Sequence, residues 1–327
     1  MTNDKLTEKS HAEALEWAMK TLKQSALNTS VVVETHWSIV VKIGISNGSV
    51  YLKQTPPDLF IEARVLRKCR EICGITDVPE VIAVNNKLHC FLMKECGDAT
   101  LRILFDGKLN VELLIQGLEV YKNLQHATAK HVDVFLQDGV PDWRLKIFSK
   151  LYQDLVSDDA FLKAHQLKSD QIKILQNAVR KVETLCQELS QYGISESLNN
   201  TDFHDNNMLF SHATQKIRII DMGETAISHP LFSLAAFLKI PSSLYNGTFS
   251  SVDYQKLRET CFNGWLEDKK SMVRVIEIIN ILLPVYLLFA QKRFLDAIDL
   301  PYNAENPMSV KQHGKIYKGF IWFLENV

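Results

Sequence analysis

The sequence predicts an α+β protein with two lobes, in which an antiparallel sheet is followed by a mainly helical part. Three observations support this prediction. β-branched and aromatic segments with turn signals fill the first hundred residues, apolar residues at helical spacing dominate beyond Gly97, and a length of 327 residues suits about two domains at ~150 residues each. We therefore expect an N-terminal lobe of residues 1–96 and a C-terminal lobe of residues 97–327.

The N-terminal lobe is expected to be a five-stranded antiparallel sheet that carries one helix, with a further helix before it. Apolar residues at helical spacing within residues 8–27 predict the first helix. Ser46-Asn47-Gly48 joins two β-rich segments as a hairpin turn would, and Asp58 is the candidate N-cap of an amphipathic helix over residues 58–73. The strands are expected at residues 31–35, 38–45, 49–55, 78–85 and 87–96.

The C-terminal lobe is expected to be helical apart from one short strand pair near residues 207–211 and 217–221. Its longest apolar run, residues 275–290, contains Glu277 and Pro284 and falls short of the ~20 residues needed to cross a bilayer. We interpret this run as a buried helix and expect no membrane partner. The earlier helices are expected at residues 110–129, 142–156, 158–166 and 169–191, and several more after residue 230.

The composition is that of an ordinary globular chain and excludes some partners. With 46% hydrophobic and 23% charged residues the chain can bury a sizeable core. Its 37 Lys and Arg against 38 Asp and Glu leave no basic excess, so nucleic acid is not an expected partner. Because the six cysteines form no CxxC pair or disulfide framework, and the polar N-terminus lacks an apolar signal-peptide core, we expect a cytoplasmic location. Cys69 and Cys73 lie one helical turn apart, where packed helix residues are favoured over metal ligands.

An unusual concentration of polar residues occurs in TDFHDNNMLF, residues 201–210, shortly before IRIIDMGE, residues 217–224. Taken alone, the first segment is as well explained by a solvated turn in which Asp and Asn cap the backbone. The second segment closes an apolar run with Asp221. A buried polar cluster needs partners, so the alternative is a site that holds a charged group.

Phosphoryl transfer requires particular residue types in this kind of cluster. A Lys holds the nucleotide phosphates, a carboxylate orients that Lys, an Asp receives the proton of the acceptor hydroxyl, and an Asn and a second Asp hold Mg²⁺. Lys53, Glu62, Asp202, Asn207 and Asp221 supply these types in that order. The order favours a kinase site over a chance turn.

The two segments resemble the catalytic and metal-binding motifs of the aminoglycoside phosphotransferase family, small-molecule kinases that share the protein-kinase fold. The usual pattern, His-Gly-Asp-x-His-x-x-Asn followed by Ile-Asp-Trp or Ile-Asp-Phe, falls here on Asn200, Thr201, Asp202, His204, Asn207, Ile220, Asp221 and Met222. The resemblance extends from about residue 31 to residue 240. It implies a bilobal protein-kinase-like fold, ATP and Mg²⁺ as cofactors, and a small-molecule hydroxyl as phosphate acceptor.

The resemblance also implies a role for each matching residue. Asp202 would be the catalytic base, and Asn207 and Asp221 the Mg²⁺ ligands that complete the catalytic set. Nucleotide binding would use the Lys53 ammonium on the α- and β-phosphates, Glu62 as its ion-pair partner, and the backbone of Lys94, Glu95 and Cys96 at the adenine edge. His204 is expected to have a positional role. Glu224 is equally well interpreted as a ligand-facing or a surface residue.

Several positions depart from the family pattern. Asn200 replaces a His, Thr201 a Gly and Ser233 an Asp, and ETHWS, residues 34–38, has no glycine for phosphate binding, which leaves Ser38 or His36 as candidate contacts. A catalytically silent nucleotide-binding protein on the same fold is therefore the alternative function. A protein kinase proper is disfavoured by the missing Gly-rich loop.

The sequence leaves the identity of the phosphate acceptor open among choline, sugars, amino alcohols, aminoglycosides and other metabolites. Acidic residues of the C-terminal region are candidates for attracting a cationic acceptor, although a solvated helix face explains them as well. They are Glu267, Asp268, Asp296, Asp299 and Glu305.

Overall fold

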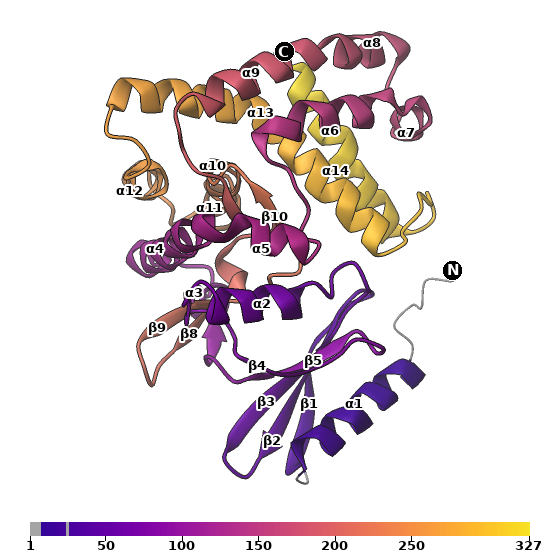
Figure 1. Ribbon diagram of the computed structural model, residues 1–327, viewed down its shortest axis with the longest axis vertical. Coiled ribbons are helices and arrows are strands. Elements are labelled where there is room, and N and C mark those ends of the chain that lie inside the picture. The colour runs from indigo at the N-terminus through magenta and orange to yellow at the C-terminus, as the bar shows by residue number, and fades with distance from the viewer. Residues whose placement is uncertain (1–7, 24–25) are drawn as a thin grey trace.

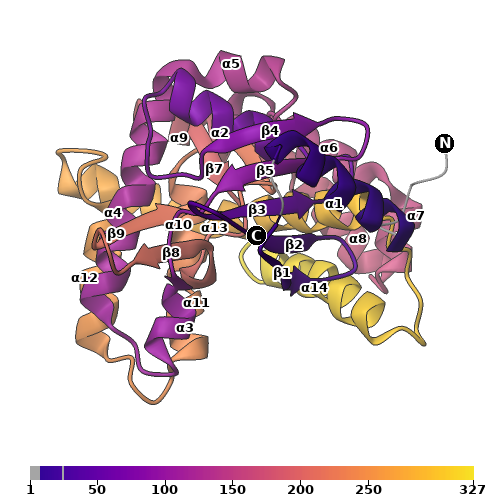
Figure 2. The ribbon, with the colours of Figure 1, turned by 90° about the horizontal axis from the view of Figure 1, so that it is seen from below.

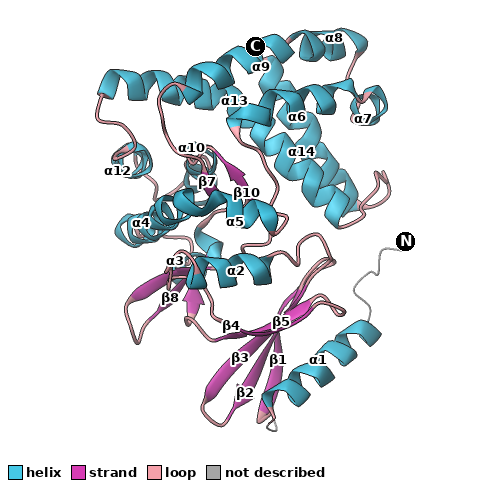
Figure 3. Ribbon diagram, in the orientation of Figure 1, coloured by secondary structure: helices cyan, strands magenta, loops and turns pink. Residues whose placement is uncertain are grey.

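The computed structural model describes residues 8–23 and 26–327, and the N-terminal part has the predicted five-stranded antiparallel sheet (Figures 1 and 3). Seen from below, the strands follow the order β1-β2-β3-β5-β4 across the sheet (Figure 2). Gly48 has φ +122°, so the predicted hairpin between β2 and β3 turns at a residue without a Cβ. The strands are β1 (Asn28–Glu34), β2 (Ile39–Ile45), β3 (Gly48–Gln54), β4 (Val81–Asn85) and β5 (Cys90–Lys94).

The two predicted helices of this lobe cover the sheet. Helix α1 (Glu8–Leu22) places Ala14 and Ala18 against the buried residues of β2 and β3. Helix α2 (Glu62–Glu71) lies between the sheet and the helical part of the molecule (Figure 1). The prediction that this helix begins at Asp58 is wrong, because the Pro56 carbonyl accepts the amides of Leu59 and Phe60 and holds residues 57–61 in turns.

The C-terminal part is mainly helical, as predicted. Its helices are α3 (Leu101–Phe105), α4 (Val111–Thr128), α5 (Val132–Gln137), α6 (Leu145–Ser157), α7 (Asp159–Ala164), α8 (Ser169–Asn177), α9 (Val179–Ser190), α10 (Leu231–Phe237), α11 (Ile240–Leu244), α12 (Ser251–Phe262), α13 (Lys269–Ala297) and α14 (Pro307–Leu324). The predicted helix over residues 169–191 is divided at Ala178, where the amide bonds to the carbonyls of both Ile174 and Leu175.

Two small sheets carry the segments that the sequence singled out. The predicted strand pair is β8 (Met208–Ser211) with β9 (Lys216–Ile219), joined by β6 (Ala99–Thr100). A second pair, β7 (Ser197–Asn200) with β10 (Thr225–Ser228), was not predicted. Gly97 lies so close to β8 that an added Cβ would be 2.8 Å from the Phe210 carbonyl oxygen, so the connection between the two parts requires a glycine here.

Helix α13 is the one described helix that is long and apolar enough to span a membrane, and 61% of its most apolar window is buried inside the protein. It packs against α10 and α14. Its buried side chains include Ile278, Leu282 and Tyr286. The helix therefore occupies the core of the C-terminal part, as the sequence predicted.

Candidate active site

All five residues of the predicted kinase set line one cleft of about 1000 Å³. One wall comes from β2, β3 and β5 of the sheet, and another from residues 201–207 and 220–224. Helices α13 and α14 form the remaining side. Residues separated by as many as 168 positions are thereby brought together.

The Lys53 ammonium joins three elements of the structure. Its Nζ lies 2.6 Å from Glu62 Oε2 on α2 and 2.8 Å from Asp221 Oδ1. The side chains of Lys53 and Glu62 are both buried. Burial by itself would lower the pKa of Lys53, but the carboxylates of Asp221 and Glu62 outweigh it and raise the pKa above its ordinary value. Lys53 therefore holds a permanent positive charge at the bottom of the cleft.

Asp221 owes its position to an unusual backbone conformation. It lies two residues beyond the end of β9 and has φ +59°, in the left-handed region that non-glycine residues seldom adopt. The Ile220 amide, just before it, donates to the Asn207 carbonyl at 3.0 Å. Burial disfavours ionisation of the Asp221 carboxyl, but attraction to Lys53 is stronger and lowers its pKa. The side chain is 53% exposed and so is open to a ligand in the cleft.

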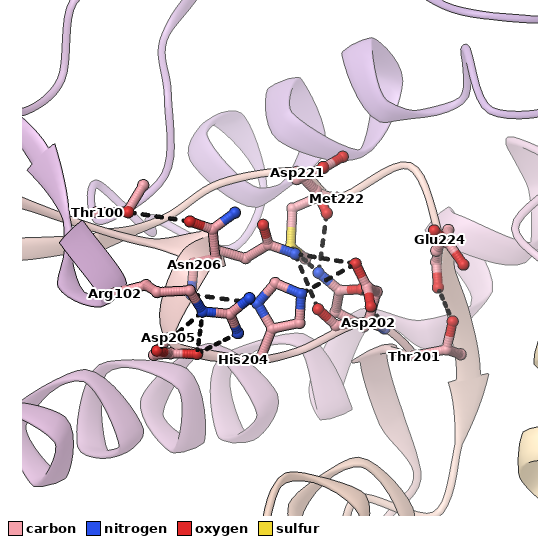
Figure 4. A network of polar contacts seen from close by, with 12 residues as sticks. Thr100, Arg102, Thr201, Asp202, His204, Asp205, Asn206, Asp221, Met222 and Glu224 are labelled. Carbon is pink, nitrogen blue, oxygen red and sulfur yellow. Dashed lines mark hydrogen bonds and ion pairs between the residues drawn. The ribbon is translucent and has the colours of Figure 1, made fainter. Parts of the chain in front are cut away.

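Asp202 and Asn207 lie on the loop that follows β7. The Asn207 amide nitrogen, Nδ2, donates to the Asp202 carbonyl at 2.8 Å and to its carboxylate at 3.3 Å. His204 Nε2 lies 3.3 Å from Asp202 Oδ2, and its positional role stays a prediction. Figure 4 shows Asp202, His204 and Asp221 around this loop. The Asp202 side chain is 50% exposed, so its carboxylate can meet an acceptor hydroxyl.

The donor set fits a magnesium ion. Because Nδ2 of Asn207 is engaged with Asp202, its Oδ1 is left for a cation, and Asp221 Oδ2 is likewise not used by Lys53. Mg²⁺ prefers oxygen ligands and is commonly held by one or two protein groups plus phosphates and water. Within residues 8–23 and 26–327, no group of three or more His, Cys, Asp or Glu side chains could hold a metal by itself. Asn207 and Asp221 therefore suit a nucleotide-bound Mg²⁺ better than a protein-only metal site.

Asn200, which replaces the family's His, connects the two acidic segments. Its side-chain Oδ1 accepts the Asp202 amide at 3.0 Å, and its Nδ2 donates to the Asp221 carbonyl at 2.9 Å. The Asn200 backbone amide donates to the Tyr121 hydroxyl at 2.8 Å. An Asn at this position thus fixes Asp202 and Asp221 relative to one another.

Ser233, which replaces the family's Asp, also remains part of the supporting network. Its hydroxyl donates to Asn199 Oδ1 at 2.8 Å and is within 3.1 Å of both Tyr121 Oη and Gln125 Nε2. All four side chains are buried. The loop is therefore anchored by neutral hydrogen bonds at this point.

Asp205 and its partners were missed by the sequence interpretation. The buried Asp205 carboxylate accepts hydrogen bonds from Arg102 and from the Tyr245 hydroxyl. Burial raises the pKa of Asp205, but these two donors outweigh that effect and lower it. The partners lie 103 and 40 residues away, and no local pattern links them to the motif.

The segment predicted to meet adenine lies at the edge of the cleft, and two of its three residues line it. Lys94 and Cys96 are in the lining, whereas the Glu95 carboxylate faces Lys42, 2.6 Å away. The Lys94 amide donates to the Glu80 carbonyl. The Cys96 amide has no hydrogen-bond partner within the part of the chain that the structure describes. Nucleotide contact at these positions stays a prediction, and Cys96 offers the available donor.

The glycine-free segment between β1 and β2 contributes residues to the wall of the cleft. Ser38 is buried and lines the cleft, while His36 is exposed and does not. The Trp37 ring meets Phe294 of α13 edge-on, with 5.1 Å between ring centroids. Of the two candidate phosphate contacts, Ser38 is therefore the one that the structure places at the cleft.

The acidic residues considered for a cationic acceptor lie elsewhere. None of Glu267, Asp268, Asp299 and Glu305 lines this cleft, and Asp296 lines a separate cavity of about 610 Å³. The cleft is lined instead by Glu224 and by Lys315 and Lys318 of α14, and Glu224 and Lys315 both interact electrostatically with Asp202. Neither lysine was singled out from the sequence, because helical spacing alone does not show which face meets a cleft.

The fold matches that of solved small-molecule kinases, and the predicted resemblance is confirmed at the level of the fold. Plasmodium vivax ethanolamine kinase superposes with a TM-score of 0.67 at 12% identity, covering 100% of this chain and 93% of that chain. Choline kinase LicA from Streptococcus pneumoniae superposes with a TM-score of 0.60 at 12% identity, covering 95% of this chain and 99% of that chain. Aminoglycoside phosphotransferase APH(2'')-Ib, with ADP bound, superposes with a TM-score of 0.57 at 14% identity, covering 95% of this chain and 99% of that chain. No protein-family model and no curated protein sequence matches this chain.

Proposed function

We propose that this protein is an ATP- and Mg²⁺-dependent phosphotransferase that transfers the γ-phosphate to a hydroxyl group of a small molecule. The observation that carries the proposal is the convergence of Lys53, Glu62, Asp202, Asn207 and Asp221 in one cleft. Proteins of similar fold include ethanolamine, choline and aminoglycoside kinases, some with GDP or ADP bound. This likeness supports nucleotide use and a small-molecule acceptor.

In the proposed reaction the acceptor oxygen attacks the γ-phosphorus in line with the bond to the departing ADP. Asp202 orients the hydroxyl and receives its proton. Lys53, held by Glu62, binds the α- and β-phosphates. Asn207 and Asp221 would hold Mg²⁺, which supplies positive charge against the developing oxyanions. Ser38 adds a neutral donor where a Gly-rich loop would otherwise meet the phosphates.

We also propose a cytoplasmic location. All six cysteines are free thiols in the structure, and an ATP-dependent enzyme of this kind requires a compartment that supplies ATP and Mg²⁺.

The proposed function is tested by nucleotide binding and ATP turnover, with and without Mg²⁺, against amino alcohols, sugars and aminoglycosides. Asp202→Ala is expected to abolish turnover while sparing nucleotide binding, whereas Asp221→Ala should also weaken Mg²⁺-dependent binding. Asp170→Ala, an exposed aspartate on α8, is the matched control.

The outcomes separate the proposed function from its alternative. Unchanged turnover in Asp202→Ala contradicts the role of Asp202. Mg²⁺-dependent nucleotide binding without turnover by any acceptor favours the catalytically silent protein. Absence of nucleotide binding contradicts both.

A further inference from the structure

One face of α14 forms the side of the cleft next to Asp202. Gln312, Lys315, Gly319 and Trp322 follow one another at the three- and four-residue spacing of a helix face, and all line the cleft together with Lys318. Two lysine side chains therefore line the cleft, and Lys315 is the one close enough to interact with Asp202, next to which the acceptor would lie. Both lysine side chains are exposed, so they are available to a ligand.

Neither lysine is neutralised by a close acidic partner. Within the described residues, neither Lys315 nor Lys318 has a carboxylate within 4.0 Å. Lys315 does interact electrostatically with Asp202 and Glu224 at longer range. This places it beside the proposed base. Desolvation in the cleft lowers the pKa of Lys315, and a bound anion would oppose this effect by stabilising the charged ammonium.

The carboxyl groups of the cleft have other partners or roles. Glu62 is paired with Lys53, and Asp98 accepts the His212 amide at 2.6 Å. Asp202 and Asp221 are the proposed base and metal ligand. Glu224 is the remaining one, and burial together with Asp202 and Asp221 raises its pKa to about 8. Glu62 and Asp98 are thus engaged by other groups, and the raised pKa of Glu224 disfavours its negative charge.

The aromatic ring that α14 contributes to the cleft already interacts with a cation of the protein. Trp322 lines the cleft, and its face is already covered by Lys239, whose Nζ lies 4.4 Å from the ring centroid. A ring face attracts one cation because its quadrupole is negative there, and a second cation would be repelled by the first. The face of Trp322 that Lys239 covers is therefore not open to a cationic substrate.

We propose that the phosphate acceptor is an anion: a small hydroxyl compound that also carries a carboxylate or phosphate group. This inference rests on the proposed function. Lys315 and Lys318 bind the anionic group, while the hydroxyl faces Asp202. The hydroxyl oxygen forms the new bond to the γ-phosphorus, the bond between that phosphorus and the ADP oxygen breaks, and the hydroxyl proton passes to Asp202. The two ammonium groups offset the repulsion between an anionic acceptor and the nucleotide phosphates.

The test uses four three-carbon probes that share two neighbouring hydroxyls and differ in charge: glycerol, 3-amino-1,2-propanediol, glycerate and glycerol 3-phosphate. Their affinities are measured by calorimetry on the protein loaded with Mg²⁺ and a non-hydrolysable ATP analogue. We expect the two anions to bind at least about ten-fold more tightly than the other probes, equivalent to about 1.4 kcal/mol. The double charge reversal Lys315→Glu/Lys318→Glu should invert this order.

Matched variants and nucleotide binding make the result decisive. Lys269→Glu/Lys270→Glu changes the same number of charges on exposed residues of α13 outside the cleft and should keep the anion preference. Equal or undetectable binding of all four probes, or an anion preference that survives Lys315→Glu/Lys318→Glu, contradicts the inference. It is also contradicted if that variant weakens nucleotide binding instead, because the lysines would then belong to the nucleotide-phosphate site. If the wild-type protein fails to bind Mg²⁺ and nucleotide, the proposed function itself fails.

Discussion

At the residue scale, the contacts of Asn200 account for the loss of the family's His. An imidazole is not required to connect the Asp202 amide with the Asp221 carbonyl, because one carboxamide can accept from the first and donate to the second. The Asn200 side chain is buried, so the Asp202 amide and the Asp221 carbonyl depend on it for these hydrogen bonds.

Asn200→Ala should therefore lower the ATP turnover number by about 100-fold, the size of effect expected when a catalytic group is displaced by roughly 1 Å. Nucleotide affinity should change little, because Lys53 keeps its contacts. Steady-state turnover and calorimetric nucleotide binding measure the two effects. Asn200→Asp retains the acceptor but loses the donor, so its turnover should fall between those of Asn200→Ala and the wild type. Normal turnover in Asn200→Ala would disprove the positioning role.

A second prediction at this scale concerns Glu224. The folded protein holds its proton up to about pH 8, whereas the unfolded chain releases it near the ordinary value of 4.5. Between these values the native state binds more protons, so the contribution of Glu224 to the free energy of unfolding falls as pH rises. Glu224→Gln cannot ionise, so it should remove the part of the fall in the free energy of unfolding that Glu224 causes as pH rises. Its Tm should exceed the wild-type Tm by more at about pH 8 than at about pH 5.

Thermal unfolding in a series of buffers measures this difference. The control is Glu259→Gln, since Glu259 is exposed on α12. A constant difference in Tm across the pH range would show that Glu224 is ionised in the folded protein.

At the scale of elements, α13 supports the cleft from the core and also contacts the segment between β1 and β2. Phe294 both lines the cleft and packs against Trp37, with Leu59 and Ala297 in the same small cluster. Where a protein kinase uses a flexible glycine-rich loop, this chain fixes the loop with an aromatic contact.

Trp37→Ala should weaken binding of Mg²⁺ and nucleotide by about three- to ten-fold, because an aromatic pair contributes about 0.5–1.5 kcal/mol beyond its buried area. The measurement is calorimetric titration with the ATP analogue. Tyr254→Ala removes a partly exposed aromatic ring from α12, away from the cleft, and should leave the affinity unchanged. Equal affinities of Trp37→Ala and the wild type would show that the closed loop does not contribute to nucleotide binding.

At the scale of the whole molecule, the ion pairs of Lys53 join the sheet, α2 and the loop after β9. A buried Lys53 ammonium without its carboxylate partners would destabilise the fold. A buried Glu62 carboxylate without the Lys53 ammonium would do the same. The same arrangement therefore contributes to stability and, under the proposed function, would also prepare the cleft for a nucleotide.

Lys53→Ala should destabilise the fold by about 3–5 kcal/mol, because it leaves Glu62 buried without its cation. Lys53→Met/Glu62→Leu replaces the pair by apolar groups of similar size and should recover much of the stability. Denaturant unfolding measures the stability and calorimetry the nucleotide affinity. Both variants should lose nucleotide binding; recovery of affinity in the double variant would show that Lys53 acts only as a structural residue.

Much of the architecture is determined by local sequence. Short-range patterns of turn residues and apolar spacing predict the hairpin at Gly48, the strands of the sheet and the long helix α13. The order of the kinase set can likewise be recognised in the sequence. Turn chemistry and periodicity act over a few residues, so they can be recognised without the fold. The start of α2 was misjudged because Pro56 adds turns that helical spacing does not show.

Only the tertiary structure decided which groups complete the site. It placed Asn200 between the two acidic segments, Arg102 and Tyr245 against Asp205, and Trp37 against α13. It also placed Lys315 and Lys318 in the lining of the cleft, with Lys315 near Asp202, and left the five acidic residues of the C-terminal region outside that lining. These contacts join residues far apart along the chain. Which face of a helix lines the cleft is decided by tertiary packing and not by helical spacing alone. The sequence therefore determined the class of chemistry expected, whereas the fold determined the charge that the acceptor side of the cleft presents.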